Sequence, residues 1–151
     1  MKSYHSVPRA FETAYFTFQI PMSASCFAQM KRHRMSTIIS SNYHPQYGFV
    51  IPPLLEKMGF TADLEKVMGK TQQMYFKLEK HKKGLGNYIL TNSHKLFVIF
   101  KANLRELYHF SRLRSDKHAQ WEIREISQKI ERLVKEKVPN AAMKMMGKSE
   151  F

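Results

Sequence analysis

Arginine side chains beside a histidine suggest anion binding near residue 33. Arg32, His33 and Arg34 are consecutive, so in an extended segment the two arginines would point to one side and His33 to the other. Two guanidinium groups on one side suit a pyrophosphate, because each presents a planar fork of N–H donors to phosphate oxygens. Basic triplets are frequent in a chain this rich in Lys and Arg, so the tripeptide alone leaves the ligand open.

A second basic row follows one face of a predicted helix that starts after Asn103. Arg105, His109 and Arg112 lie at positions i, i+4 and i+7, and Arg114 lies near the end of the helix. On a helix this spacing places the three side chains on one face, opposite the apolar residues that we expect to be buried. The row could bind a phosphate or an anionic ring, or it could be an ordinary solvated helix face.

Several other kinds of site find no support in the sequence. The histidines form no His-Glu-x-x-His pair, and Gly84 and Gly86 are not followed by a third glycine or by a Lys-Ser/Thr pair, so neither a zinc-protease motif nor a phosphate loop is present. Cys26 is the only cysteine, which excludes an intrachain disulfide and a zinc site made of several thiolates. We therefore predict no metal site.

The overall charge is strongly positive and predicts a polyanionic partner. The chain has 151 residues, with 25 Lys and Arg against 12 Asp and Glu, which gives a formal net charge of +13. The longest apolar run, 96–100, is far too short to cross a bilayer, and the N-terminus has no apolar stretch of signal-peptide length. We expect a cytoplasmic protein without a membrane partner.

The strands that must position these residues are predicted from hydrophobic spacing. Alternating or continuous apolar runs predict strands at 15–20, 87–90 and 95–102. Pro21 is expected to end the first strand. Residues 35–53, which contain several Ser, Asn and Pro, are expected to form a loop with room for one short strand.

Helical spacing predicts four helices, whose starts are marked by capping residues. They run from Ser23 or Ser25 towards Arg32, from Thr61 or Asp63 to the lysines just before Gly84, from Asn103 to about Arg114, and from Ser115 or Asp116 to just before Pro139. The second is expected to bury Leu64, Val67, Met68, Thr71, Met74, Tyr75 and Leu78. We predict an α+β fold in which a short, mainly antiparallel sheet packs against three or four helices. The prediction is a single domain over 1–139, followed by a C-terminal tail over 140–151.

Four segments resemble, in the same order, motifs of the flavin-dependent thymidylate synthase family. They are Phe11-Glu12 with Phe16-Thr17-Phe18, Gln29 with Arg32-His33-Arg34, Asn103-x-Arg105 with His109, and the stretch Leu113-Arg114-Ser115-Asp116-Lys117-His118-Ala119-Gln120-Trp121-Glu122-Ile123-Arg124. The last stretch is long and specific, so chance does not explain it. The resemblance runs from about Phe11 to Pro139, and the family's opening strand and helix are missing from it.

The resemblance implies a flavoenzyme. Members of this family bind FAD, usually as homotetramers whose active sites are built from several subunits. Reduced flavin, recharged by NADPH, supplies the hydride, and methylenetetrahydrofolate supplies the carbon that turns dUMP into dTMP. The resemblance therefore implies a homo-oligomer, for example a tetramer, or a pairing with a second synthase domain.

The matched positions imply roles for particular residues. Binding of FAD is implied for Glu12, Arg32, His33, Arg34, Asn103, Arg105 and His109. Binding of the nucleotide is implied for Gln29, Ser40, Ser41, Asn42 and Arg114. Arg114 is also implied as the catalytic residue, because it would hydrogen-bond the uracil ring. Arginine suits these roles, since its guanidinium group pairs with a pyrophosphate or with a polarised ring carbonyl.

Two arginines of the family pattern have no counterpart in this chain. The family places a Glu, a Ser and an Arg after Arg-His-Arg, where this chain has Ser40, Asn42 and His44; a shift of one residue would supply Ser41 but not the arginine. A further family arginine, which holds the nucleotide phosphate, aligns with Asn87. The flavin half of the site is thus retained, and the dUMP-phosphate half is eroded.

These observations leave three hypotheses open. The chain could be an active synthase subunit with a divergent nucleotide pocket. It could instead be a FAD-binding domain that is catalytically inactive, serves assembly, or forms half of a tandem synthase, and the eroded phosphate site favours this second hypothesis. A basic nucleic-acid-binding domain ranks lowest, because no aromatic side chains are interleaved with the arginines as a stacking platform.

Overall fold

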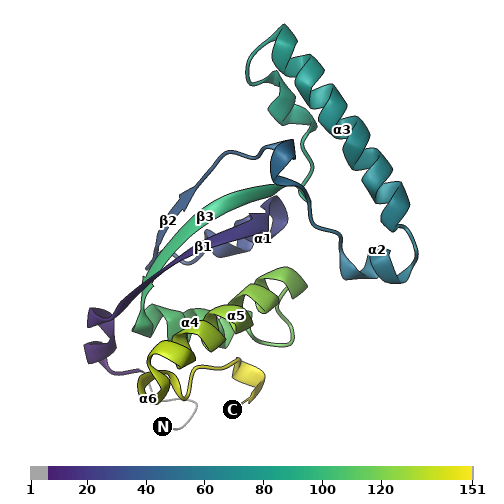
Figure 1. Ribbon diagram of the computed structural model, residues 1–151. Helices are drawn as coiled ribbons and strands as arrows, with labels where there is room; N and C mark the ends of the chain where they lie inside the picture. The colour runs from purple at the N-terminus through teal and green to yellow at the C-terminus, as the bar shows by residue number, and fades with distance from the viewer. Residues whose placement is uncertain (1–6, 151) are drawn as a thin grey trace. The chain divides into compact units, whose positions relative to one another are not determined.

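The computed structural model describes residues 7–150. The strands are β1 (Tyr15–Ser23), β2 (Thr37–Ser40) and β3 (Lys95–Asn103). The α-helices are α1 (Ala24–Met30), α2 (Pro53–Lys57), α3 (Thr61–His81), α4 (Leu104–Arg114), α5 (Trp121–Lys137) and α6 (Pro139–Ala142) (Figure 1). Short 3-10 helices are η1 (Arg9–Thr13), η2 (Pro45–Tyr47), η3 (Leu85–Ile89) and η4 (Lys148–Glu150). The strands form one antiparallel sheet in the order β1-β3-β2, which confirms the predicted α+β class.

The chain divides into two compact units. Unit 1 holds residues 7–19, 28–39 and 99–150 of the described chain, and unit 2 holds residues 20–27 and 40–98. Both basic motifs identified from the sequence belong to unit 1. Among the described helices, none combines the length and the apolar character that a membrane span requires.

Backbone hydrogen bonds just beyond the ends of β1 and β3 fix the antiparallel register of these two strands. In unit 1 the Leu104 N–H donates to the Ala14 carbonyl at 2.8 Å, and in unit 2 the Ala24 N–H donates to the His94 carbonyl at 3.0 Å. Pro21 lies inside β1 and does not end it, contrary to the prediction. The strand order places β1 at an edge of the sheet, where proline is tolerated because one side of the strand needs no hydrogen-bond donors.

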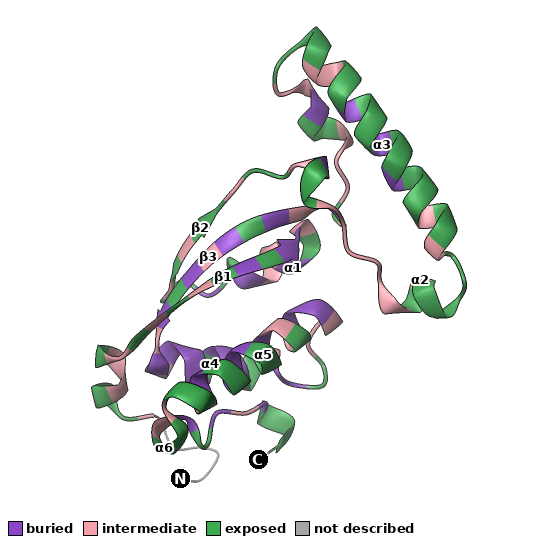
Figure 2. Cartoon of the chain, viewed as in Figure 1, coloured by how far each residue is buried: buried purple, intermediate pink, exposed green. Residues whose placement is uncertain are grey.

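Unit 1 builds its core from β3, α4 and α5. Alternate residues of β3 are buried, and the ring centroid of Phe100 lies 5.2 Å from that of Phe110 on α4. α4 packs against α5 and η1, and Figure 2 shows buried residues along α4 and α5. Asn103 caps α4 as predicted, because its Oδ1 accepts a hydrogen bond from the Glu106 N–H at 2.9 Å. α4 is therefore held both at its start and along its buried face.

α5 begins later than the sequence prediction, which placed its start near Asp116. The helix starts at Trp121, and the Gln120 Oε1 atom accepts the capping hydrogen bond from the Ile123 N–H at 3.0 Å. Asp116 instead folds a turn, because its Oδ1 accepts a hydrogen bond from the His118 N–H at 3.0 Å. The same hydrogen bond holds the pKa of Asp116 below its usual value.

Residues 140–150 pack into unit 1. Met145 is fully buried, and the Tyr108 hydroxyl donates a hydrogen bond to the Ala141 carbonyl at 2.7 Å. Gly147 approaches the turn after α4 so closely that a Cβ atom there would lie 2.8 Å from the Ser115 carbonyl oxygen. This segment thus contributes to the core of unit 1, while the predicted domain boundary at residue 139 stays a prediction.

In unit 2, α3 packs against η3 and η2. Met68, Thr71 and Tyr75 form the buried side of α3. This buried stripe is narrower than predicted, because Val67 and Met74 are exposed.

The predicted strand at 87–90 is wrong, since most of this segment belongs to the 3-10 helix η3. The Glu79 carboxylate on α3 explains the difference. Its Oε1 accepts hydrogen bonds from the Gly86 N–H at 2.8 Å and from the Gly84 N–H at 3.0 Å. The segment is thereby folded back onto α3, and Gly84, with a φ of 88°, provides the left-handed turn between the two elements.

Replacing Gly86 with alanine is expected to destabilise the protein by about 1–3 kcal/mol through overpacking. A Cβ atom at residue 86 would lie 2.7 Å from Cδ2 of Tyr75 and 2.9 Å from Oε1 of Glu79. Gly69→Ala is the matched control, because a Cβ atom there meets nothing within 4 Å and alanine favours a helix interior by about 0.5–1 kcal/mol. Urea unfolding should place Gly69→Ala at or above the wild type and Gly86→Ala below it. Equal midpoints for the two variants would contradict the prediction.

Candidate functional site

The turn after α1 positions the Arg-His-Arg tripeptide. The His33 N–H donates a hydrogen bond to the carbonyl of Met30, the last residue of α1, at 3.1 Å. The segment is a turn and not the extended stretch considered from the sequence, yet it still separates the side chains: His33 is buried, while Arg32 and Arg34 are exposed. Two guanidinium groups therefore flank a histidine whose ring belongs to the interior of unit 1.

α4 carries the second set of predicted residues. Arg105 is half-buried, and His109 and Arg112 are exposed, so the predicted basic row does lie on the accessible side of the helix. Arg114, the last residue of α4, is half-buried. Glu106, the neighbour of Arg105 in the sequence, is buried.

A continuous chain of hydrogen bonds in unit 1 links α4 to the turn after α1. Oε1 of Glu106 lies 3.2 Å from Nδ1 of His33, and Nε of Arg114 donates to Nε2 of His33 at 2.9 Å. Arg114 also binds Gln29: its Nη1 donates to the side-chain Oε1 of Gln29 at 3.0 Å, and its Nη2 donates to the backbone carbonyl of Gln29 at 3.3 Å. We name this set Glu106–His33–Arg114–Gln29 the His33 chain. It joins two of the four segments that carry the resemblance, the one that holds Gln29 and His33 and the one that holds Arg114.

The His33 chain defines which nitrogen of His33 carries the proton. A guanidinium group can only donate, so Nε2 of His33 accepts the hydrogen bond from Arg114 and is unprotonated. An ionised carboxylate can only accept, so Nδ1 carries the proton and donates to Glu106. A neutral ring thus connects a buried carboxylate with Arg114, and the three acceptors on His33 and Gln29 fix the orientation of the guanidinium plane.

Glu12 and Arg105, two residues predicted to bind a cofactor, form an ion pair in unit 1. Glu12 also pairs with Arg9, whose Nε lies 3.4 Å from the carboxylate. Hydrogen bonds from Arg105 and, to a lesser extent, from Arg9 hold the pKa of Glu12 below its usual value. The pair brings η1 next to the first turn of α4.

Arg32 and Arg34 differ from the other arginines near the His33 chain. Within residues 7–150, neither guanidinium group has an ion pair or a hydrogen bond to another residue. Exposed arginine forks without a carboxylate partner suit the oxygens of a phosphate or pyrophosphate. The donor set of this turn therefore fits the pyrophosphate of a dinucleotide cofactor such as FAD.

Asn103 is the N-cap of α4, and His109 lies on the helix itself. The Oδ1 atom of Asn103 is engaged in the cap of α4, so its amide NH2 group is the part that could meet a ligand. The ring centroid of His109 lies 6.1 Å from that of His33, and its side chain is exposed. Their contacts with a cofactor stay predictions.

The predicted nucleotide-binding residues Ser40, Ser41 and Asn42 belong to unit 2. Ser41 is bound to β3, because its N–H donates to the Phe97 carbonyl at 2.9 Å and its Oγ accepts from the Phe97 N–H at 3.0 Å. Ser40 and Asn42 are exposed. The other two predicted nucleotide residues meet in the His33 chain of unit 1, so the predicted set is divided between the units.

The positions where the family pattern has its two arginines are occupied differently. His44 caps η2, since its Nδ1 accepts a hydrogen bond from the Gln46 N–H at 3.3 Å, and its ring centroid lies 5.2 Å from that of Tyr75. Asn87 is exposed in η3. Unit 2 therefore has a helix-capping imidazole and an exposed amide where a phosphate-binding fork would be needed.

Glu106 is the site residue that sequence reasoning missed. It lies between the buried residues Leu104 and Leu107, and only 8% of its surface is exposed. A carboxylate on the apolar side of a helix is the signal that could have found it, because buried charges almost always have a partner. Its partner His33 lies 73 positions away, so spacing along the chain could not reveal the contact. Within the part of the chain that the structure describes, no group of three or more His, Cys, Asp or Glu residues could hold a metal ion.

Comparison with known proteins matches the chain to a family of thymidylate synthases. A family model described as thymidylate synthase complementing protein (Thy1) matches residues 1–140. The flavin-dependent thymidylate synthase of Pyrococcus furiosus is 35% identical over 133 residues, which cover 79% of this chain and 54% of that enzyme. The flavin-dependent thymidylate synthase of Thermotoga neapolitana is 29% identical over 152 residues, which cover 92% of this chain and 69% of that enzyme.

A further similar protein is considerably longer than this chain. UPF0159 protein Ta1429 of Thermoplasma acidophilum is 26% identical over 138 residues, which cover 90% of this chain but 28% of that protein. The chain thus spans about half the length of the Pyrococcus enzyme and less than a third of the Thermoplasma protein. Since the family model covers nearly the whole sequence and the His33 chain joins two of the motifs that resemble the family, the chain belongs to the flavin-dependent thymidylate synthase family.

Proposed function

We propose that this chain is the FAD-binding part of a flavin-dependent thymidylate synthase. The reaction is the conversion of dUMP into dTMP, with methylenetetrahydrofolate as the carbon donor and NADPH as the reductant. The observation that supports this proposal best is the His33 chain, which brings Gln29 and His33 of one family motif to Arg114 of another. A set of polar contacts between motifs this far apart in sequence is what a shared binding site requires.

Arg32 and Arg34 would hold the pyrophosphate of FAD, because they are exposed and have no carboxylate partner among residues 7–150. Asn103, Arg105 and His109 would contribute contacts along α4, with Glu12 keeping Arg105 in place. Hydride donation is the chemistry that the reduced flavin supplies when it is bound. The chain's own part is to bind the cofactor and to orient it.

Arg114 would hydrogen-bond the uracil ring and stabilise negative charge on its carbonyl oxygen. Its guanidinium group is oriented before any ligand arrives, because His33 and Gln29 hold it through three hydrogen bonds. Glu106 acts through His33 and is therefore a positioning residue. Preorganisation of this kind favours catalysis, because the group needs no reorientation when charge develops.

A titration tests the proposal with the protein as purified. Added FAD should give saturable binding, seen as a change in flavin fluorescence, and dUMP added to the FAD-loaded protein should perturb the flavin absorption bands. Flavin binding without any response to millimolar dUMP would mean that FAD is bound but that the nucleotide site is lost. A protein that takes up no FAD would overturn the proposal.

A second candidate is a catalytically inactive or tandem-dependent FAD-binding domain. The Thermoplasma relative favours it, because this chain matches only 28% of that longer protein, and so does the absence of arginine at residues 44 and 87. In this case a partner domain, or another subunit of a homo-oligomer, would supply the missing phosphate contacts. Growth of a thymidine auxotroph that expresses this chain alone would support the active enzyme, and failure of growth with a folded, FAD-loaded chain would support the second candidate.

A further inference from the structure

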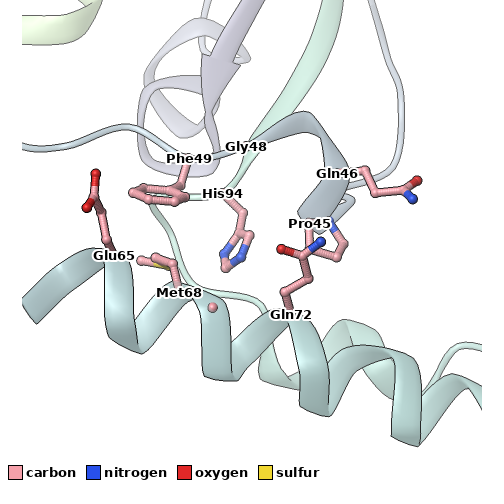
Figure 3. A pocket seen from close by; sticks show the side chains of 9 residues that line it. Pro45, Gln46, Gly48, Phe49, Glu65, Met68, Gln72 and His94 are labelled. Carbon is pink, nitrogen blue, oxygen red and sulfur yellow. The ribbon is translucent and has the colours of Figure 1, made fainter. Parts of the chain in front are cut away.

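Unit 2 contains a cavity that is separate from the proposed FAD and dUMP site. None of the residues of that site lines the cavity. Its volume is about 530 Å³, and it lies between one side of α3 and the segment 45–49 (Figure 3). Gly69 leaves a gap in its helical wall, because a Cβ atom built on this residue meets nothing within 4 Å. The space is large enough for a ring system with a sugar attached.

His94 is the buried polar group of this cavity. Only 1% of its surface is exposed, and its Nδ1 accepts a hydrogen bond from the Thr91 N–H at 3.0 Å. Burial lowers the pKa of His94, so the ring is neutral near pH 7. Because Nδ1 accepts the hydrogen bond from Thr91, the proton of the neutral ring lies on Nε2. Within residues 7–150, Nε2 has no hydrogen-bond partner. Figure 3 shows the ring projecting into the cavity toward α3.

The other side chains define what His94 could bind. Gln72 points into the cavity from α3 next to the His94 ring, and Phe49 and Met68 provide apolar surface on the other side of the ring (Figure 3). An amide offers both a donor and an acceptor, so His94 and Gln72 together match a ligand edge with alternating acceptors and donors. An aromatic ring and a thioether suit the faces of a flat ligand.

The charge of the cavity is unusual for this chain. Although the chain has a net charge of +13, no Lys or Arg lines the cavity, and Glu65 is its one ionised group. A phosphate would therefore meet a carboxylate and no cation, which opposes its binding. This preference is opposite to that of Arg32 and Arg34.

From these contacts we infer that the cavity in unit 2 binds an uncharged planar heterocycle of the nucleobase type, as a free base or a nucleoside without phosphate. His94 donates from Nε2 to a ring carbonyl or ring nitrogen, and Gln72 pairs with the neighbouring donor and acceptor. Phe49 and Met68 cover the ring. This site is separate from the proposed FAD and dUMP site and does not depend on it.

NMR of the protein labelled at its methionine methyl groups tests the inference. The Met68 signal, assigned with Met68→Leu, reports on the cavity during titration with uridine and with adenosine. We expect saturable shifts for at least one nucleoside with a Kd on the order of 0.1–1 mM, a value typical of a ligand of this size. UMP and AMP are expected to bind at least about fivefold more weakly than their nucleosides, because of Glu65.

Gly69→Leu fills the cavity and is expected to weaken nucleoside binding at least about tenfold. Lys70→Leu, which introduces the same side chain at the next and exposed position of α3, should leave the affinity within about twofold. No saturable Met68 shift up to 10 mM of either nucleoside, unchanged binding by Gly69→Leu, or tighter binding of the monophosphates would each overturn the inference. Because FAD uptake is measured separately, failure here is distinguishable from failure of the proposed flavin site.

Discussion

Replacing His33 with leucine is expected to lower the free energy of unfolding by about 2–4 kcal/mol, because it breaks a buried polar network at its centre. The His33 side chain is 3% exposed and that of Glu106 is 8% exposed. Leucine would leave the Glu106 carboxylate buried without the N–H that now compensates it. It would also remove the acceptor for Nε of Arg114. Urea unfolding followed by circular dichroism measures the change.

A double-mutant cycle separates this network effect from the loss of a buried ring. Glu106→Leu removes the carboxylate, and the double variant His33→Leu/Glu106→Leu removes both partners. The loss of unfolding free energy in the double variant should therefore be smaller than the sum of the two single losses by about 1–3 kcal/mol. His109→Leu is the matched control, since His109 is exposed on the same helix and should change stability by less than about 0.5 kcal/mol. Additive costs within about 0.5 kcal/mol would show that His33 and Glu106 are not coupled.

The cycle also has a readout for function. Glu106→Gln keeps an acceptor oxygen for Nδ1 of His33. Its free energy of unfolding should therefore fall less than that of Glu106→Leu. If Glu106 positions Arg114 through His33, Glu106→Leu should weaken the response of the FAD-loaded protein to dUMP, while Glu106→Gln should largely restore it. A purely structural role would lower stability without changing the dUMP response of the folded fraction.

Local patterns predicted the elements that carry the site better than they predicted the site itself. The cap at Asn103 and the strand that precedes it follow from residue types a few positions apart, and both are confirmed. The predicted start of α5 was wrong because the Asp116 carboxylate can cap a turn as readily as a helix. The strand expected at 87–90 failed because the Glu79 carboxylate, outside that segment, binds its backbone.

The candidate site shows the same division between local and long-range information. His33 and its neighbouring arginines could be identified from their types, and the turn after α1 then determines that the ring is buried and the arginines are exposed. The partner of His33 could not be identified, because Glu106 lies on another element and contacts it only through the tertiary packing of unit 1. Residue types thus predict which chemistry is available, whereas the fold decides which groups meet.

Replacing Arg32 and Arg34 together with glutamine is expected to weaken FAD binding by about 10²–10⁴-fold. A hydrogen bond to a charged group contributes about 1.5–3 kcal/mol, and each 1.4 kcal/mol changes the dissociation constant tenfold. Stability should hardly change, because both side chains are exposed and have no partner among residues 7–150. Flavin fluorescence titration gives the affinity, and urea unfolding checks the fold.

A charge-matched control distinguishes a specific pyrophosphate site from general attraction of FAD to a basic protein. Lys129→Gln/Arg132→Gln also removes two positive charges, but from exposed positions of α5 in unit 1. This variant should weaken FAD binding less than about threefold at 0.15 M salt, because exposed charges beyond about 8 Å are screened there. Arg32→Lys/Arg34→Lys keeps the charge but removes the planar fork, so its loss should be intermediate, about tenfold. If the two glutamine double variants lost the same affinity, the arginines of the tripeptide would act only through net charge, and the pyrophosphate assignment would be wrong.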